Sequence, residues 1–126
     1  MDLEIDVSSL EAVYEQIVRQ IQQGVQQGTL APGTALPSIR QLADDLDLNH
    51  NTVARAYKIL ETNRVIRTAG RKGTFIHGDA SSHIHSRNSH DAAYQMNELV
   101  TALFEKGLSK VQIEAVFKTA LAIKRT

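Results

Sequence analysis

The stretch that decides the fold is "LPSIRQLADDLDLNHNTVARAYKILE", residues 36–61. Its apolar spacing predicts two short helices with only a few residues between them. Ser38 with Gln41 three residues later is typical of a capping box at a helix start, and Asn49 is suited to cap the second helix. The second helix, over residues 49–62, is left with a polar outer face. The expected inner faces are Ile39, Leu42, Ala43 and Leu46 on the first helix, and Val53, Ala56, Tyr57 and Leu60 on the second.

The segment before this stretch predicts a strand and a longer helix. "LEIDV", residues 3–7, alternates apolar and acidic residues, which favours a short strand. Ser8 and Glu11 have the spacing of another capping box. An apolar stripe at helical spacing follows and Gly28 is a suitable stop, so we expect one helix between these signals.

The segment after the second short helix predicts two strands. Residues 65–68 and 74–77 have strand character and are joined by a basic turn that contains glycine. Three helices followed by a β-hairpin are the plan of a winged helix-turn-helix domain. We therefore expect a mainly α fold with a small β-hairpin, and a winged domain over residues 1–77.

The rest of the chain predicts a linker and a helical hairpin. The stretch "DASSHIHSRNSH" is polar and has no periodicity, so we expect a linker over residues 78–90. Residues 91–126 predict two helices that form an αα-hairpin. Gly107 is expected to end the first helix, and Ser109 with Gln112 is expected to cap the second.

Both helices of the predicted hairpin, 91–106 and 109–124, have a wide apolar stripe. Two helices of this length cannot bury both stripes against each other, and an exposed apolar patch of several hundred Å² is more than a monomer usually tolerates. We therefore expect two copies to pack as a four-helix arrangement with two-fold symmetry. The expected dimerisation residues are Met96, Leu99, Val100, Leu103, Phe104, Ile113, Val116, Phe117, Ala120 and Leu121.

Composition excludes several classes of protein. The chain has 126 residues and no cysteine, which excludes disulfides, thiolate zinc sites and cysteine nucleophiles and fits a reducing compartment. The acidic start has no apolar run of the kind that a signal peptide needs. No stretch approaches the roughly 18 apolar residues of a membrane span. We expect a cytoplasmic protein with no membrane partner.

Charge is unevenly distributed although the formal net charge is zero. Residues 1–48 contain eight acidic and two basic residues, whereas residues 49–77 contain six basic residues and one acidic residue. A basic segment within a neutral protein is the electrostatic footprint expected of a nucleic-acid partner.

The sequence resembles the N-terminal domain of the GntR family of bacterial transcription regulators over roughly residues 3–77. The motifs that carry the resemblance are "GTLAPGTALPSIRQLA", "NHNTVARAYKILE" and "GTFI". The short part after the wing is similar to the YtrA-type branch, whereas the branches with a ligand-binding or aminotransferase domain are much longer. The resemblance implies a short helical dimerisation hairpin in place of a ligand-binding domain.

The second helix of a helix-turn-helix lies in the major groove of DNA, while the first crosses the backbone. The outer face of the 49–62 helix is therefore expected to contact base edges. The resemblance implies that Arg40 lies near the groove edge and that Lys72 and Gly73 lie at the wing. The full set of expected DNA-contact residues is Arg40, Asn49, His50, Asn51, Thr52, Arg55, Lys58, Arg71, Lys72 and Gly73.

Three positions depart from the family pattern. Ala54 stands where many relatives have a polar or basic contact residue, so contact there would be apolar. Arg64 stands where relatives usually have glycine; if the site needs a positive φ, either Asn63 takes over the turn or Arg64 is strained. Gly70 is one place earlier than usual, so the sequence does not determine the conformation of the wing tip.

The sequence predicts a sequence-specific DNA-binding transcription regulator that binds a palindromic operator as a homodimer, and the resemblance implies that it is a repressor. The alternative is a winged-helix module that binds protein and has no specific DNA binding. His83, His85 and His90 invite a metal site, but their polar surroundings lack a packed second shell, so we expect no metal and no cofactor. With no catalytic triad, phosphate loop or buried carboxylate pair, we expect no enzyme. The residues do not determine the operator, the regulated genes, any small-molecule effector, or whether the protein activates or represses.

Overall fold

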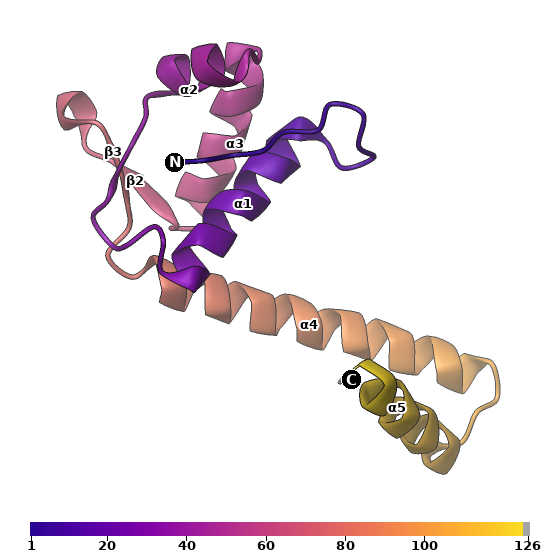
Figure 1. Ribbon diagram of the computed structural model, residues 1–126. Helices are drawn as coiled ribbons and strands as arrows, with labels where there is room; N and C mark the ends of the chain where they lie inside the picture. The colour runs from indigo at the N-terminus through magenta and orange to yellow at the C-terminus, as the bar shows by residue number, and fades with distance from the viewer. Residues whose placement is uncertain (125–126) are drawn as a thin grey trace. The chain divides into compact units, whose positions relative to one another are not determined.

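The computed structural model describes residues 1–124, which form five α-helices and three short strands (Figure 1). Two compact units divide the chain: a winged unit, Met1–Ser86, and a C-terminal unit from Arg87 onward. The last two residues of the predicted 91–126 hairpin lie outside the described part. The elements in order are α1 (Val13–Gln27), β1 (Ala35–Leu36), α2 (Ile39–Leu46), α3 (His50–Thr62), β2 (Ile66–Thr68), the 3₁₀ turn η1 (Gly70–Lys72), β3 (Thr74–Ile76), α4 (Ala80–Glu105) and α5 (Lys110–Lys124).

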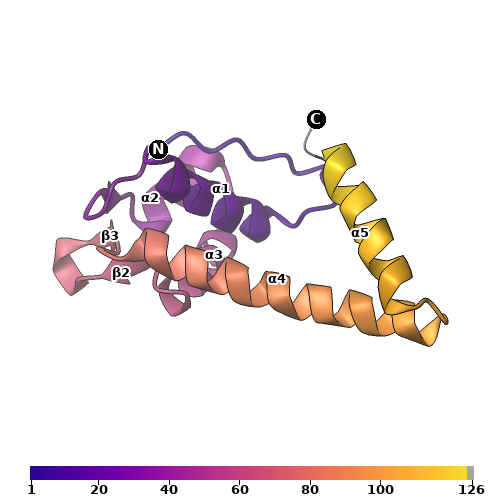
Figure 2. The same cartoon turned by 90° about the horizontal axis from the view of Figure 1, so that it is seen from below.

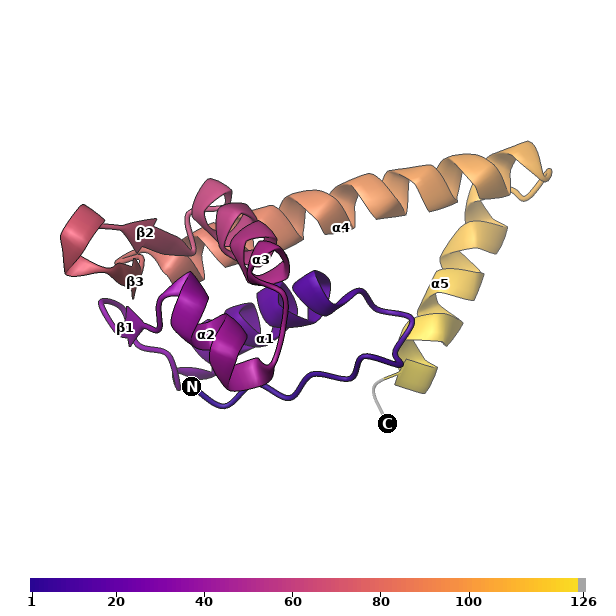
Figure 3. The same ribbon diagram turned by 90° about the horizontal axis from the view of Figure 1, so that it is seen from above.

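The core of the winged unit is aliphatic. α3 packs against both α1 and α2, and Figure 3 shows the three helices gathered together with the sheet beside them. Each of the four inner-face residues predicted for α3 is buried. The largest fully buried side chains are Ile17, Ile21, Leu60, Ile66, Ile76, Val53 and Val65. This mainly α fold with a small antiparallel sheet confirms the predicted fold class.

A third strand joins the predicted β-hairpin. The sheet has the order β1-β3-β2, with Arg67 opposite Phe75 on one side of β3 and Ala35 opposite Phe75 on the other. β1 is two residues long, too short to leave a periodic pattern in the sequence. β3 is the central strand, and β1 and β2 are the two edge strands of the sheet. The turn between β2 and β3 projects at one end of the winged unit (Figure 2).

The start of α1 was predicted wrongly. The helix begins at Val13, and its N-cap residue, Ala12, provides no side-chain hydrogen bond. Instead of capping, Ser8 donates from its hydroxyl and its backbone N–H to a carboxylate oxygen of Asp6. Leu10, which lies inside the predicted capping box, precedes the helix and is exposed. The predicted end was right, because Gly28 adopts a φ of 84° at the C-cap.

The N-terminal segment is extended but pairs with glutamine side chains rather than with a strand. The Gln20 amide donates to the carbonyl of Glu4 at 2.7 Å and accepts from the N–H of Glu4 at 2.9 Å. The Gln16 amide does the same with Asp6, at 2.8 and 2.9 Å. The predicted strand over residues 3–7 was therefore wrong, since a helix face supplies the hydrogen bonds that a strand would have supplied.

On α2 the predicted inner face is half right. Leu42 and Ala43 are buried, whereas Leu46 is half-buried and Ile39 is 36% exposed. Ile39 is the first residue of the helix, and its side chain lies at the edge of a surface depression described below. Helical periodicity cannot tell a core face from the rim of a groove.

The stretch expected as an aperiodic linker, residues 78–90, is mostly helical, so that prediction was wrong in secondary structure. α4 runs without a break from Ala80 to Glu105. Ala80 and Ile84, four residues apart and thus on one face, are buried in the core of the winged unit. These two buried residues anchor the first turns of α4 to the core. Two apolar residues in a polar stretch are too few to give the periodic pattern from which a helix is predicted. Further along, Gly107 ends the helical run with a φ of 95°.

The capping box predicted for α5 is complete. The Gln112 N–H donates to the Ser109 hydroxyl, and the Ser109 N–H donates to the Gln112 side-chain carbonyl. Among the described residues, no helix combines the length and the apolar composition that crossing a bilayer requires.

Candidate nucleic-acid interface

Local hydrogen bonds set the geometry of the helix-turn-helix. Ser38 accepts from the N–H of Gln41 at 3.0 Å and caps α2, while the side chain of Asn49 accepts from the N–H of Asn51 at 2.8 Å and caps α3. Between the helices, Asp47 has a φ of 54°, and the Leu48 N–H closes the turn on Ala43 at 2.8 Å. These two predicted caps were right, and each cap bond joins residues at most three positions apart in the chain.

Tyr57 holds α3 to the entrance of α2. Its hydroxyl donates to the carbonyl of Pro37 at 2.7 Å, just before the N-cap residue of α2. The ring is buried, and burial raises the pKa of Tyr57 to about 12 because the phenolate would lose its hydration. The hydroxyl therefore stays a hydrogen-bond donor over the whole physiological range.

The residues predicted to contact DNA fall into three groups within the winged unit. Arg40 lies in the first turn of α2, the residues from His50 to Lys58 lie on α3, and Arg71 to Gly73 lie at the wing turn. All of the predicted residues are exposed except Thr52, which is half-buried. The structure thus gathers them on three adjacent elements and leaves them accessible.

Two predicted contact residues already have protein partners. The His50 imidazole Nε2 lies 3.3 Å from a carboxylate oxygen of Asp44 on α2. The Arg55 guanidinium carbon lies 3.8 Å from the centroid of the Tyr14 ring on α1, a cation–π stack. Neither contact could be predicted, because each joins residues on different helices. The stack on Tyr14 directs the Arg55 side chain toward α1. The contact with His50 places the Asp44 carboxylate beside the start of α3.

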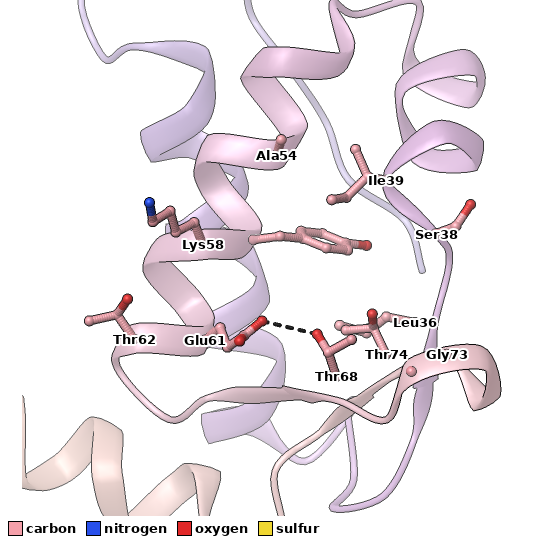
Figure 4. A pocket seen from close by; sticks show the side chains of 12 residues that line it. Leu36, Ser38, Ile39, Ala54, Lys58, Glu61, Thr62, Thr68, Gly73 and Thr74 are labelled. Carbon is pink, nitrogen blue, oxygen red and sulfur yellow. Dashed lines mark hydrogen bonds between the residues drawn. The ribbon is translucent and has the colours of Figure 1, made fainter.

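A depression lies between α3, the start of α2 and the wing (Figure 4). Its volume is about 550 Å³. Lys58 and Ala54 line it from α3, and Ser38 and Ile39 line it from the other side. Its remaining lining residues are Leu36, Tyr57, Glu61, Thr62, Thr68, Gly70, Gly73 and Thr74. Ala54, one of the departures from the family pattern, is thus part of the lining of this depression.

Glu61 ties the end of α3 to the wing. Its carboxylate accepts a hydrogen bond from the Thr68 hydroxyl at 3.0 Å, as the dashed line in Figure 4 marks. Sequence reasoning passed over Glu61 because it is the lone acid in a basic segment. This hydrogen bond joins β2 to the C-terminal end of α3.

The wing turn has a defined conformation. Gly70 has a φ of 58°, and Gly73 has a φ of 109° with a ψ of −162°, a region open to glycine alone. The Ala69 N–H donates to the Gly73 carbonyl at 2.8 Å and closes the turn. Arg71 and Lys72 lie between the two glycines and are exposed. The displaced Gly70 is therefore accommodated by a 3₁₀ turn.

Arg64, and not Asn63, takes the strained position before the wing. Its φ is 59°, while that of Asn63 is −82°. The Arg64 N–H donates to Glu61, and the Val65 N–H donates to Leu60 at 2.9 Å. This is the Schellman pattern, in which the left-handed residue is usually glycine.

The predicted dimerisation residues lie together in the C-terminal unit. Nine of the ten line one apolar groove of about 510 Å³ between α4 and α5. Phe104 is not among the lining residues and is 50% exposed.

His83, His85 and His90, the histidines that invited a metal site in the sequence, do not lie together. His85 and His90 are exposed on α4, whereas His83 lies instead against His77 and Asp79. The spacing H-x-D-x-x-x-H was present in the sequence, but it crosses from a strand end to a helix start.

Comparison with known proteins assigns the winged unit. Residues 13–76 match the family described as "Bacterial regulatory proteins, gntR family". The chain is 46% identical over 74 residues to the HTH-type transcriptional regulator Rv1152 of Mycobacterium tuberculosis, covering 59% of this chain and 61% of that one. It is 40% identical over 80 residues to the HTH-type transcriptional repressor YtrA of Bacillus subtilis, covering 64% and 62%. The chain thus spans about three-fifths of the length of these relatives.

Solved structures resemble most of the chain. A transcriptional regulator from Oenococcus oeni has a TM-score of 0.70 and 32% identity, over 95% of this chain and 99% of that one. YtrA from Sulfolobus acidocaldarius, a GntR-family transcription factor, has a TM-score of 0.56 and 25% identity, over 98% and 99%. The short YtrA-type proteins are therefore among its relatives in both sequence and fold. With its winged helix-turn-helix and this match over half of its length, the chain belongs to the gntR family of bacterial transcription regulators.

Proposed function

We propose that this protein represses transcription by binding a palindromic DNA operator as a homodimer. The observation that carries the proposal is the α3 helix, whose N-terminus is capped by Asn49 and whose outer face is exposed, with the wing turn across the depression that α3 lines. A helix of this kind fits the major groove, with its first residues at the base edges.

The groups on the winged unit suggest separate roles. Asn51 is suited to contact a base edge, because its amide both donates and accepts hydrogen bonds. Arg40, Arg71 and Lys72 are exposed cations at the margins, where phosphates would lie. Lys58 lines the depression beside the wing, and Figure 4 shows its ammonium group projecting from α3 on the side away from Ser38 and Ile39. We propose that it contacts a phosphate of the DNA strand at this margin.

Dimerisation is proposed because the C-terminal unit has no core of its own. From His85 to Lys124, no side chain is buried. An apolar groove of about 510 Å³ lies along α4 and α5, and Phe117 and Leu121 in it are 45% and 48% exposed. Helices stabilised only by their own backbone bonds are marginal in water, so a second copy is the partner that would bury this surface. A two-fold dimer makes the interface isologous.

A palindromic operator follows from the same symmetry. Two recognition helices related by a two-fold axis contact two inverted half-sites, spaced by about one helical turn of DNA or a multiple. Each half-site alone binds weakly, and the dimer raises the effective concentration of the second. Repression is supported by the relative YtrA of Bacillus subtilis, which is named a transcriptional repressor.

The test is selection of DNA by the full-length protein, followed by sequencing and a titration of the selected duplex at several salt concentrations. We expect an inverted repeat, affinity at least about 10³-fold above that for scrambled DNA, and a log K that falls linearly with log[salt]. A winged module that only binds proteins would enrich no sequence. That result would overturn the proposal.

A further inference from the structure

We infer that His77, Asp79 and His83 form a binding site for a divalent first-row transition-metal ion of the zinc class. Each residue offers one ligand atom, and these atoms all lie within 4.8 Å of one another. His77 follows β3, Asp79 precedes α4, and His83 lies in the first turns of that helix. The site therefore joins the last strand of the winged unit to the helix that leaves it.

The donor set selects the metal. Two imidazole nitrogens and one carboxylate oxygen suit zinc, nickel or cobalt, whereas magnesium and calcium prefer oxygen ligands alone. In a tetrahedral zinc site with ligands at about 2.0–2.2 Å, the donor atoms are about 3.3 Å apart. The three side chains therefore need to close by about 1.5 Å at most, a rotation that exposed Asp79 and the half-buried histidines can make. A fourth position is left for water.

The metal would replace weak contacts already present. The His77 Nδ1 accepts a hydrogen bond from the Asp79 N–H at 3.0 Å, and the His77 and His83 rings meet edge to face with centroids 5.1 Å apart. In this tautomer the proton is on His77 Nε2. Binding through either nitrogen exchanges one neutral hydrogen bond, worth about 1 kcal/mol net, for a coordination bond.

The surrounding charges nearly cancel. The same depression, of about 400 Å³, is lined by Glu61, Arg64 and Arg67 as well as by the three ligands. Two arginines oppose a cation, while Asp79 and Glu61 attract it. Affinity must therefore come from coordination rather than from a general negative field, so alkaline-earth cations should not compete.

The scaffold around the site is anchored by the core of the winged unit. Ala80 and Ile84, on α4 beside the ligands, are 1% and 2% exposed in the core of the winged unit, and His83 donates from its N–H to the Asp79 carbonyl at 3.1 Å. A metal can thus bind to a folded junction instead of having to fold it. His85 and His90 are exposed on the same helix and serve as matched controls.

The test is calorimetric titration of zinc into the full-length, chelator-treated protein, without DNA. We expect one zinc ion per chain and a raised melting temperature, with no effect from magnesium. His83→Gln and Asp79→Asn should each lower the zinc affinity by roughly tenfold or more, the scale found even for residues behind the ligands. His85→Gln should keep wild-type affinity, and circular dichroism checks that every variant is folded.

No saturable zinc binding by the wild-type protein would overturn the inference. So would unchanged affinity in both the His83→Gln and Asp79→Asn variants, or loss of binding in His85→Gln, which would move the site along α4. Because the titration contains no DNA, its result is independent of the proposed operator binding.

Discussion

Arg55 combines a proposed DNA contact with an observed contact inside the protein. Its guanidinium lies over the Tyr14 ring at 3.8 Å, and the side chain is still exposed. A guanidinium stacked on an aromatic face keeps its N–H groups at the edge of the plane, available to a base or phosphate. Tyr14 would then act as a positioning residue that orders Arg55 before DNA arrives.

Replacing Arg55 tests this role. We expect Arg55→Ala to lower operator affinity by roughly 1–3 kcal/mol, the scale of one good base contact. Tyr14→Leu should give a smaller loss, because the guanidinium remains but is no longer held. Fluorescence anisotropy with the selected operator measures both. A folded Arg55→Ala protein that keeps full operator affinity would exclude Arg55 from the interface.

Tyr57 makes stability depend on alkaline pH. Its pKa is raised to about 12 in the folded protein, whereas an unfolded tyrosine has a pKa of about 10. Below pH 10 the hydroxyl is protonated in both states and its contribution is complete. As the pH rises through 10 to 12, the unfolded state loses its proton first, so the stabilisation is lost.

The corresponding variant is Tyr57→Phe. Between pH 9 and pH 11 we expect the wild-type free energy of unfolding to fall by about 1.4 kcal/mol more than that of the variant. Urea unfolding at the two pH values measures the difference, and comparison with the variant cancels the titration of lysines and other tyrosines. Equal slopes in the two proteins would mean that Tyr57 is not shielded from water.

Arg64 adopts a left-handed backbone conformation at the end of α3. It has a φ of 59° at the left-handed position that ends α3, where glycine is preferred. The Schellman hydrogen bonds of Arg64 and Val65 compensate for this conformation. The side chain of Arg64 also lines the depression at the β3–α4 junction, together with Glu61 and Asp79.

At the scale of elements, the wing is a hairpin that presents cations at its turn. β2 and β3 are three residues each, and the turn is closed by the Ala69–Gly73 hydrogen bond. Arg67, on β2, lies over the Phe75 ring at 5.3 Å. The cations beyond it at the turn, Arg71 and Lys72, are exposed.

Neutralising the wing turn should therefore change the salt dependence of binding. In the Arg71→Ala, Lys72→Ala double variant, each lost phosphate contact should flatten the slope of log K against log[salt] by about 0.9. Specific and non-specific DNA should be weakened alike. The exposed pair Lys106 and Lys110 at the α4–α5 turn, changed to alanine, serves as the control. An unchanged slope in the wing variant would mean that the wing does not meet the backbone.

At the scale of the whole molecule, the two units differ in what stabilises them. The winged unit has a buried aliphatic core, whereas the described part of the C-terminal unit buries no side chain. Its apolar groove, with Met96, Leu99 and Phe117 among the lining residues, is the surface on which the proposed homodimer depends.

A charged side chain in this groove should prevent dimerisation while the winged unit stays folded. We expect Phe117→Glu to give monomers with a folded winged unit and lost operator affinity, because a carboxylate cannot be buried there without a partner. Ala122→Glu introduces the same charge on α5 outside the groove lining and should leave the dimer intact. Light scattering measures the mass. A wild-type chain that is monomeric at micromolar concentration would refute the dimer and the palindrome together.

The sequence by itself determined the features that depend on neighbouring residues. The caps at Ser38, Asn49 and Ser109 form within three residues of chain, and the helix ends at Gly28 and Gly107 need only a positive φ. The inner face of α3 followed from its period. With the family motifs, these local signals were enough to predict the winged fold and the surface proposed to contact DNA.

Only the tertiary structure decided the contacts between distant residues. The pairing of β1 with β3, the stack of Arg55 on Tyr14, the helical start of α4 on Ile84 and the meeting of His77 with His83 all join separate elements. None leaves a periodic or capping signal, because each depends on where the whole core places two backbones. Local hydrogen bonds act over a few residues of chain, but burial is shared among all the elements that enclose a side chain, and it exists only once they have packed.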